Sequence, residues 1–176
     1  KRTMMKTLLY RTVIMVAIMA PLALMANRGG LNGKYTKEKT IKKEFKVNSD
    51  ALFKVRNSYG NLNLTSWNED RIVIEVRIKT NGNNEERVID RLNEIDVDFE
   101  SSASMVSART LFGQKDNWGW KWNKKKNVNV QVNYTIKLPV KNSINLSNDY
   151  GHIYLDRIDG HAKIACDYGK IEAGEL

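Results

Sequence analysis

Apolar and polar side chains alternate along most of the chain beyond residue 40, which is the period of a β-strand with one buried face. The strictest run covers residues 72–78, where isoleucine and valine alternate with charged residues. A second long run covers residues 128–138 and stops at Pro139. Shorter alternating runs occupy residues 41–47, 51–64, 95–99 and 105–112. This pattern predicts a nearly all-β chain.

One segment has the period of a helix instead. Asn81–Asn84 offers side chains that can cap a helix, and the two glutamates that follow favour its positive N-terminus. Val88, Leu92 and Ile95 then form an apolar stripe on one helical face. We therefore expect one short helix within residues 85–95.

A four-residue pattern that ends in Tyr-Gly occurs three times. The copies are Asn57–Gly60, Asn148–Gly151 and Cys166–Gly169, and each is followed by two small or apolar residues at the same offsets. The last two copies lie 18 residues apart. The same spacing aligns further apolar positions, namely Leu146 with Ile164 and Ile153 with Ile171. A fixed period of this size indicates stacked repeats.

Each Tyr-Gly pair suits the corner of a coil. Glycine supplies the positive φ that a sharp turn needs, and an asparagine or aspartate just before the tyrosine can bond backbone groups of the corner. The tyrosine rings can stack from one coil to the next. The predicted corner residues are Tyr59, Gly60, Tyr150, Gly151, Tyr168 and Gly169.

These features predict an all-β, β-solenoid-like fold, with stacked repeats, long antiparallel strands and one short α-helix. A β-sandwich whose turns share Asx-Tyr-Gly chemistry by chance is the alternative. The two differ in whether equivalent corners stack at the spacing of neighbouring strands, about 4.8 Å.

The N-terminal residues differ in character from the rest of the chain. Four basic residues precede an apolar, uncharged run from Thr12 to Ala26, which has the length of a secretory signal and is short for a membrane span. We predict a signal peptide in residues 1–26, a flexible leader in 27–40 and a single β-repeat domain in 41–176. An uncleaved membrane anchor is the alternative. The predicted location is outside the cytoplasm, in the periplasm or at the cell surface.

Removal of the predicted signal peptide lowers the net charge from +9 to +5, because four of the 29 basic residues and none of the 20 acidic ones lie in it. So modest an excess does not favour nucleic acid as a partner. Cys166 is the single cysteine, which excludes an internal disulfide. Its repeat equivalent is Asn148, so we expect a small structural residue here and not a nucleophile.

Several of these segments together resemble the putative adhesin family, a group of exported bacterial domains of formerly unknown function. The family is common in Bacteroidetes and related to the head domains of autotransporter adhesins. The resemblance covers residues 41–176 and rests on Asn57–Leu62, on Trp67 before a charged turn, on the strand that ends in Leu138-Pro139, and on Asn148–Gly151. It implies an exported β-solenoid-like domain in which further Tyr-Gly turns follow, so the domain is expected to be truncated at its C-terminus.

Three tryptophans alternate with other residues within five positions and are followed by lysines. In an extended segment all three indoles share one side, where they could stack on sugar rings or enter a membrane interface. A hairpin tip whose tryptophans cover a neighbouring sheet is the alternative. The candidate ligand surface comprises Trp118, Trp120, Trp122, Lys121, Lys124, Lys125 and Lys126. The partners considered are a cell-surface glycan, a membrane surface and an envelope protein, with the oligomeric state left open.

The sequence contains no motif typical of catalysis or metal binding. The two histidines, His152 and His161, belong to no His-Glu-x-x-His pattern, and a Gly-x-Ser-x-Gly elbow is absent. Four aspartates cluster in the repeats, at positions 149, 156, 159 and 167, without the spacing of a known calcium loop. We interpret them as turn residues and expect no catalytic residue, no metal and no cofactor.

The function expected from the sequence is a non-enzymatic cell-envelope protein that presents a rigid β-repeat surface for adhesion or scaffolding. Two alternatives come from other classes. One is a carbohydrate-active enzyme on a β-helix, which would need carboxylates that converge in a groove. The other is an envelope regulatory module that binds a protein through a sheet edge.

We predict cleavage after Ala26, because the basic start and apolar run have the composition of a secretory signal. Intact-mass analysis of envelope fractions should give a product that begins at Asn27. A cytosolic protein that retains residues 5–26 would contradict the prediction.

Overall fold

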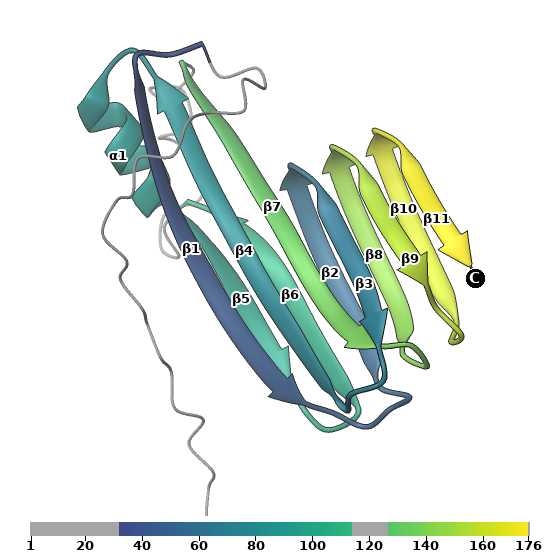
Figure 1. Ribbon diagram of the computed structural model, residues 1–176. Coiled ribbons are helices and arrows are strands. Elements are labelled where there is room, and N and C mark those ends of the chain that lie inside the picture. Colours follow the sequence, from purple (N-terminus) through teal and green to yellow (C-terminus); the bar gives the residue numbers. More distant parts are fainter. Residues whose placement is uncertain (1–31, 114–126, 176) are drawn as a thin grey trace, which may run out of the picture.

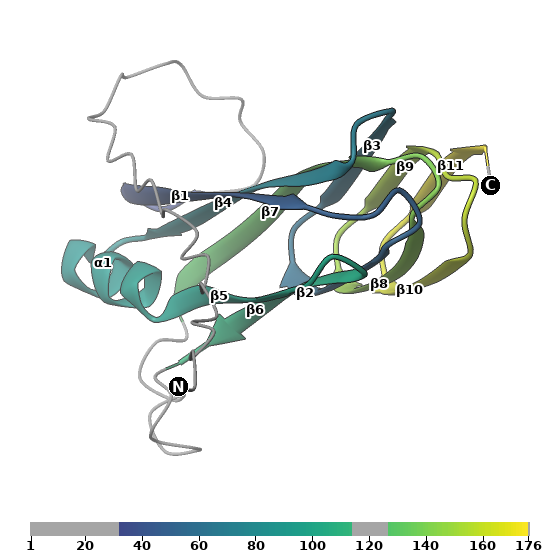
Figure 2. The same cartoon turned by 90° about the horizontal axis from the view of Figure 1, so that it is seen from below.

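Inward-facing isoleucine, leucine and valine side chains meet between two β-sheets, and their alternation with polar residues decides which face of each strand is buried. The computed structural model describes residues 32–113 and 127–175 of the chain. In these residues the sheets form two layers, with one helix at one end (Figures 1 and 2). The predicted secondary structure, which is mostly β with one short helix, is confirmed.

The first sheet has six strands in the order β1-β4-β7-β3-β9-β11. β1, β4 and β7 pair antiparallel, whereas β7, β3, β9 and β11 pair parallel. The strands span Tyr35–Lys46 (β1), Arg71–Gly82 (β4), Val128–Pro139 (β7), Leu62–Trp67 (β3), Ile153–Arg157 (β9) and Ile171–Glu175 (β11).

The second sheet has five strands in the order β10-β8-β2-β6-β5. All of its pairings are parallel except that of β5 with β6. The strands span Ala162–Tyr168 (β10), Ser143–Tyr150 (β8), Leu52–Tyr59 (β2), Met105–Phe112 (β6) and Ile95–Ser101 (β5).

The helix α1 (Glu85–Asn93) begins as the sequence predicts. The side chain of Asn84 accepts a hydrogen bond from the Arg87 amide at 2.9 Å, which caps the first turn. Val88 and Leu92 are buried, and the Thr80 hydroxyl donates to the Val88 carbonyl at 2.9 Å. The helix therefore covers the sandwich at the β1 and β4 side (Figure 1).

Three strand pairs, β2–β3, β8–β9 and β10–β11, each cross from one sheet to the other through a Tyr-Gly corner. Their registers align Tyr59, Tyr150 and Tyr168 in one row across the three pairs. Leu146 pairs with Ile164 and Ile153 with Ile171, which are the partners that the 18-residue spacing predicts. The two facing sheets fit the sandwich alternative.

The corner glycines are required by the backbone that lies next to them. Gly60 and Gly151 have φ of 137° and 135°, so the predicted positive φ is confirmed at both. Gly169 does not share this conformation, and there the prediction is wrong. A Cβ at Gly151 would nevertheless overlap the Gly60 carbonyl, and one at Gly169 would overlap the Gly151 carbonyl. Positions 151 and 169 thus need glycine because the preceding corner lies where a side chain would start, and at Gly60 the Val132 carbonyl of β7 occupies that place.

Two boundaries differ from the sequence-based expectation. β1 begins at Tyr35, so residues 35–40 belong to a strand and not to the leader. They pair with residues 77–82 of β4, which supplies the hydrogen bonds that make this polar segment regular. The helix ends at Asn93, and Ile95 already belongs to β5. The predicted signal peptide lies outside the described residues.

We predict that Gly151→Ala and Gly169→Ala both destabilise the protein, for different reasons. At Gly151 a positive φ and the overlap with the Gly60 carbonyl act together, and we expect a loss of about 3–5 kcal/mol. At Gly169 only the overlap acts, and a loss of about 1–3 kcal/mol follows. Urea unfolding of each variant measures both values.

Gly113→Ala is the matched control, since Gly113 has φ of 107° but no atom of the described residues lies within 4 Å of a Cβ built there. It should lose only the conformational part, about 1–2 kcal/mol. Equal losses in Gly113→Ala and Gly151→Ala would mean that the close approach of the corners is unimportant.

Candidate functional site

The three Tyr-Gly corners form a continuous column of stacked aromatic rings. The ring centroids of Tyr59 and Tyr150 lie 5.5 Å apart and those of Tyr150 and Tyr168 lie 4.9 Å apart, with interplanar angles of 4° and 5°. Phe112 meets Tyr59 edge-on at 5.5 Å and ends the column. The predicted stacking of the corner tyrosines is therefore confirmed. Tyr150 and Tyr168 are 48% and 67% exposed, so the column forms an aromatic strip on the surface.

A second column lies inside the corner, two residues before each tyrosine. Asn57 donates to the Val132 carbonyl at 3.0 Å, and Asn148 donates to the Gly60 carbonyl at 2.9 Å. The Cys166 thiol, in the equivalent place, donates to the Gly151 carbonyl at 3.3 Å. The backbone of each corner is thus bonded by this residue and not, as predicted, by the one just before the tyrosine. Burial and the Asp167 charge raise the pKa of the Cys166 thiol, which favours the protonated donor.

The asparagine column continues into a buried polar network. Asn57 also donates to Asn148 Oδ1 at 3.1 Å and accepts from the Thr110 hydroxyl at 2.9 Å. Thr110 Oγ1 lies 2.8 Å from the Tyr134 hydroxyl. Since the single hydroxyl proton of Thr110 is used toward Asn57, Tyr134 must be the donor. Burial raises the pKa of Tyr134 well above its usual range, so this proton stays in place.

The side chains of Asn133 in β7 and of the residues after Gly60 and Gly151 each accept a hydrogen bond from a backbone amide of the neighbouring corner. Asn133 Oδ1 accepts from the Asn61 amide and Asn61 Oδ1 from the His152 amide, both at 2.9 Å. His152 Nδ1 accepts from the Lys170 amide at 3.0 Å. His152 is exposed, as expected, but its ring has a structural partner.

The aspartates of the repeats are also held by neighbours. Asp149 accepts from the Ser58 hydroxyl at 2.8 Å, Asp156 from the Ser66 amide at 2.9 Å, and Asp159 from the Arg157 guanidinium at 2.9 Å. Across residues 32–113 and 127–175, no group of three His, Cys, Asp or Glu side chains is placed to hold a metal ion. Asp149, Asp156 and Asp159 therefore act as turn and cross-strand acceptors.

The predicted ligand surface, which comprises Trp118, Trp120, Trp122, Lys121, Lys124, Lys125 and Lys126, lies outside the described residues. Trp67 is described, and it lies between two cations. Its ring centroid is 4.7 Å from the Arg71 guanidinium and 5.6 Å from the Lys137 ammonium, and its Nε1 donates to the Arg71 carbonyl at 2.9 Å. These contacts hold the indole against β4 and β7. Within the described part of the chain, no helix is long and apolar enough to cross a membrane.

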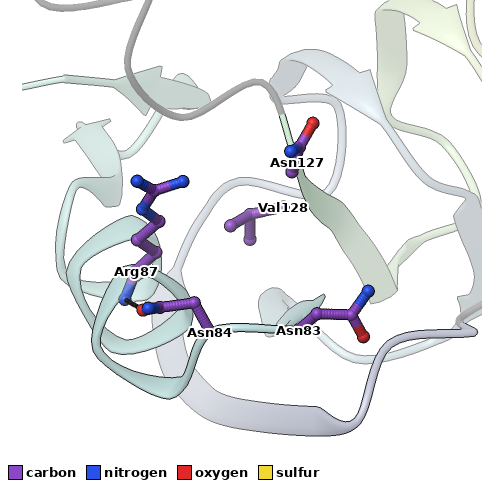
Figure 3. A pocket seen from close by; sticks show the side chains of 5 residues that line it. All are labelled: Asn83, Asn84, Arg87, Asn127 and Val128. Carbon is purple, nitrogen blue, oxygen red and sulfur yellow. Dashed lines mark hydrogen bonds between the residues drawn. The ribbon is translucent and has the colours of Figure 1, made fainter.

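The surface of the described residues includes two depressions. One, of about 220 Å³, lies at the start of α1 and is lined by Asn83, Asn84, Arg87, Asn127 and Val128 (Figure 3). The other, of about 440 Å³, lies across the face of β3, β9 and β11 and is shallow. The first offers amides and one guanidinium, and the second offers Tyr154, Asp156 and Glu172. The second therefore places two carboxylates and the Thr65 hydroxyl around one shallow depression.

The sequence pattern did contain a signal for the buried hydrogen-bonding residues that the sequence analysis missed. Asparagine opens the repeated pattern in two of its three copies, so its position was visible, although its role was assigned to the residue that directly follows it. Thr110 and Tyr134 stand at inward positions of otherwise apolar alternating strands. A polar residue at such a position indicates a buried hydrogen bond.

Comparisons with known proteins give only distant similarity. No protein-family model and no curated protein matches the chain. The solved structures that resemble it include a putative cell adhesion protein from Clostridium sporogenes, with a TM-score of 0.36 and 12% identity over 80% of this chain and 100% of that one. A putative adhesin from Bacteroides fragilis gives a TM-score of 0.32 and 12% identity over 77% of this chain and 55% of that one. Similarity this low supports no conclusion about function.

We predict that Asn57→Ala lowers the free energy of unfolding by about 2–4 kcal/mol, because it leaves the Thr110 hydroxyl, Asn148 Oδ1 and the Val132 carbonyl without this partner. Thr110→Val in the same background should add less than it costs alone, since the bond between Asn57 and Thr110 is already lost and only the acceptor of the Tyr134 hydroxyl is removed in addition. Chemical denaturation of the single and double variants measures this coupling. Asn63→Ala, on the outer face, is the control and should lose less than about 1 kcal/mol. Additive losses at Asn57 and Thr110 would show that the network is not shared.

Proposed function

We propose that this chain is a non-enzymatic, exported cell-envelope protein that presents a rigid β-repeat surface for adhesion or scaffolding. The observation that carries the proposal is the repetition of one set of contacts at successive corners. Tyrosine stacks on tyrosine, glycine lies against glycine, and an inward side chain donates to the preceding corner's carbonyl. Such a stack repeats the same surface at each coil, which is typical of proteins that work by presenting a surface.

We further propose that the strand pairs β2–β3, β8–β9 and β10–β11 are coils of a β-solenoid. Their parallel registers support this, because like residues of each pair lie opposite one another in both sheets. Backbone bonds such as Gly60 amide to Tyr150 carbonyl, 2.8 Å, and Gly151 amide to Tyr168 carbonyl, 3.0 Å, continue the pairing through the corners. The long antiparallel strands β1, β4 and β7 then form the opposite part of the domain.

The hydrogen bonds of the side chains best suited to catalysis support a function without catalysis. Cys166 and His152, which are the residues of this region most suited to covalent or acid–base chemistry, are both bonded to the backbone of a neighbouring coil. Asp156 is held in the same way by the Ser66 amide. A side chain that joins two coils is restrained where it is, so its function is to keep the coils in register.

The outer face of β1 and β4 is polar and ordered by ion pairs across the strands. Glu38 contacts Arg77 at 3.3 Å and Lys79 at 3.2 Å, and Lys42 contacts Glu75 at 2.9 Å. These pairs are exposed, so each adds little stability, but both signs are interspersed over the face. We place adhesion elsewhere, on the aromatic and basic surface that the sequence indicates between residues 118 and 126.

The ligand proposed for that surface is an anionic glycan or a lipid headgroup. Indoles provide contact area for a sugar ring or a membrane interface, and the lysines attract negative charge. Both ligand sources share this chemistry, and the measurement below separates them. The apolar start of the chain supports the exported location that such ligands require.

Replacement of Trp118, Trp120 and Trp122 by alanine should abolish retention on cell-surface polysaccharide or on anionic liposomes and leave the melting temperature nearly unchanged. The indoles supply the contact area in this proposal and take no part in the core. Polysaccharide and liposomes are assayed separately, so that retention on one alone identifies the source.

Changing Lys124, Lys125 and Lys126 to glutamine is the matched control, which retains the indoles. It should weaken binding and remove its salt dependence. A large fall in melting temperature with binding intact would show that the tryptophans are structural, and the ligand surface would then be excluded.

A further inference from the structure

The outer faces of the two sheets differ in how their charged residues are arranged. On the six-stranded sheet, cations contact carboxylates of neighbouring strands, as Arg77 contacts Glu38 at 3.3 Å. On the five-stranded sheet, which is the lower layer in Figure 2, the central strand β2 carries Lys54 and Arg56. Among the described residues, neither of these two cations forms an ion pair. One face therefore neutralises its cations, and the other leaves them unpaired.

Arg56 and Arg109 place two like charges side by side on this face. They are Cα partners in the parallel register of β2 and β6, and the residues before and after each are buried, so both side chains lie on the outer face. Such partners lie about 4.8 Å apart, and like charges directly opposite one another destabilise a sheet. Arg109 contacts Asp98 of β5 at 3.4 Å, and Arg56 has no such contact in the described part of the chain. A surface arrangement that costs stability indicates a functional site.

The side chains around these cations are short and polar. Ser147 of β8 is the second Cα partner of Arg56. Ser107 of β6 and Asn145 of β8 are the partners of Lys54. The hydroxyl and amide groups form a low floor, and the longer cationic side chains extend beyond it. Both guanidinium groups are exposed, so a ligand on this face can reach them.

The basic surface, defined as Lys54, Arg56 and Arg109, lies on the interior strands of the sheet. β2 and β6 each pair with a strand on both sides. Toward the Tyr-Gly corners the surface ends at Ser58, whose hydroxyl donates to Asp149 at 2.8 Å. Toward β5 it ends at the carboxylate that contacts Arg109. Since that carboxylate offsets one of the three cations, two positive charges remain uncompensated.

We propose that the basic surface binds an acidic polysaccharide through its carboxylates. A guanidinium group matches a carboxylate with two parallel N–H···O bonds, and the serine and asparagine side chains beside it can bond sugar hydroxyl groups. The three cations line neither of the two depressions described above. A single anion on an exposed face is held only weakly. A polymer that carries a carboxylate on successive sugars makes several such contacts at once, which raises the affinity.

A nucleic acid fits this surface less well. The cross-strand partners of the three cations are serine, asparagine, aspartate and arginine, and none is an aromatic ring on which a base could stack. The basic surface shares no residue with the ligand surface proposed above between residues 118 and 126. Either surface can therefore bind without the other.

Binding of the full chain to immobilised polygalacturonate at low ionic strength tests the proposal, with dextran sulfate and neutral dextran measured in parallel. Every chain in the series carries glutamine in place of Lys124, Lys125 and Lys126, so that these lysines of the other surface do not contribute. Polygalacturonate should be bound and dextran should not. Arg56→Gln and Arg109→Gln should each raise the dissociation constant for polygalacturonate about tenfold, because each removes one forked contact.

Arg77→Gln is the matched control, because it removes the same charge from the other sheet, where Arg77 is already paired with Glu38. It should leave the affinity unchanged. Arg56→Lys keeps the charge but loses the fork, and so it should lose most of the affinity that Arg56→Gln loses. Arg56→Gln should also keep or raise the melting temperature, since it removes a contact between like charges.

Four results would overturn the proposal. The first is a chain that binds dextran sulfate alone or binds none of the three polymers. The second is an equal loss of affinity in Arg77→Gln and Arg56→Gln, which would show that only the net charge matters. The third is full affinity in Arg56→Lys, which would exclude the forked contact with a carboxylate. The fourth is a lower melting temperature in Arg56→Gln with binding unchanged, which would make this arginine structural.

Discussion

The close approach of one Tyr-Gly corner to the next is the contact on which the rest of this structure depends. A side chain at Gly151 would overlap the carbonyl of Gly60, and one at Gly169 would overlap that of Gly151. Without glycine the corners could not come within hydrogen-bonding distance, and the strands on either side would lose their parallel partners. Both sheets therefore take their register in this region from a contact between backbones.

Side-chain chemistry then reinforces what the backbone contact allows. The tyrosine rings stack on the outer side of the corners. On the inner side, Asn57 and Asn148 donate hydrogen bonds to backbone carbonyls of the neighbouring strands. The outer stack is substantially exposed and contributes modestly, whereas the inner bonds are buried and costly to break. Cys166 retains the same bond with a weaker donor, which is consistent with its place at the less buried end of the column.

This arrangement also explains why the molecule has two unlike ends. The antiparallel part is closed by α1 and by charged edge strands, so it stops the sheets from growing. The parallel part adds one coil upon another with the same contacts, and nothing in that geometry favours a particular number of coils. The adhesive role proposed above uses the surface that these coils repeat.

The sequence by itself determined the strands, the helix and the repeat register. Period-two alternation predicted β7 nearly to the residue and β4 apart from its last four residues, and an 18-residue spacing predicted the pairing of Leu146 with Ile164. Local chemistry was enough in these cases, because a half-buried strand and a glycine corner are specified by neighbours in the chain.

Only the tertiary structure decided three other features. The polar residues 35–40 became part of β1 because β4 lies beside them, and no local pattern reports a distant strand. Gly169 needs no positive φ but still has no room for a side chain, which depends on a corner 18 residues away. The network of Asn57, Thr110 and Tyr134 joins strands that are far apart in sequence, so its burial and its hydrogen bonds exist only once the sheets face each other.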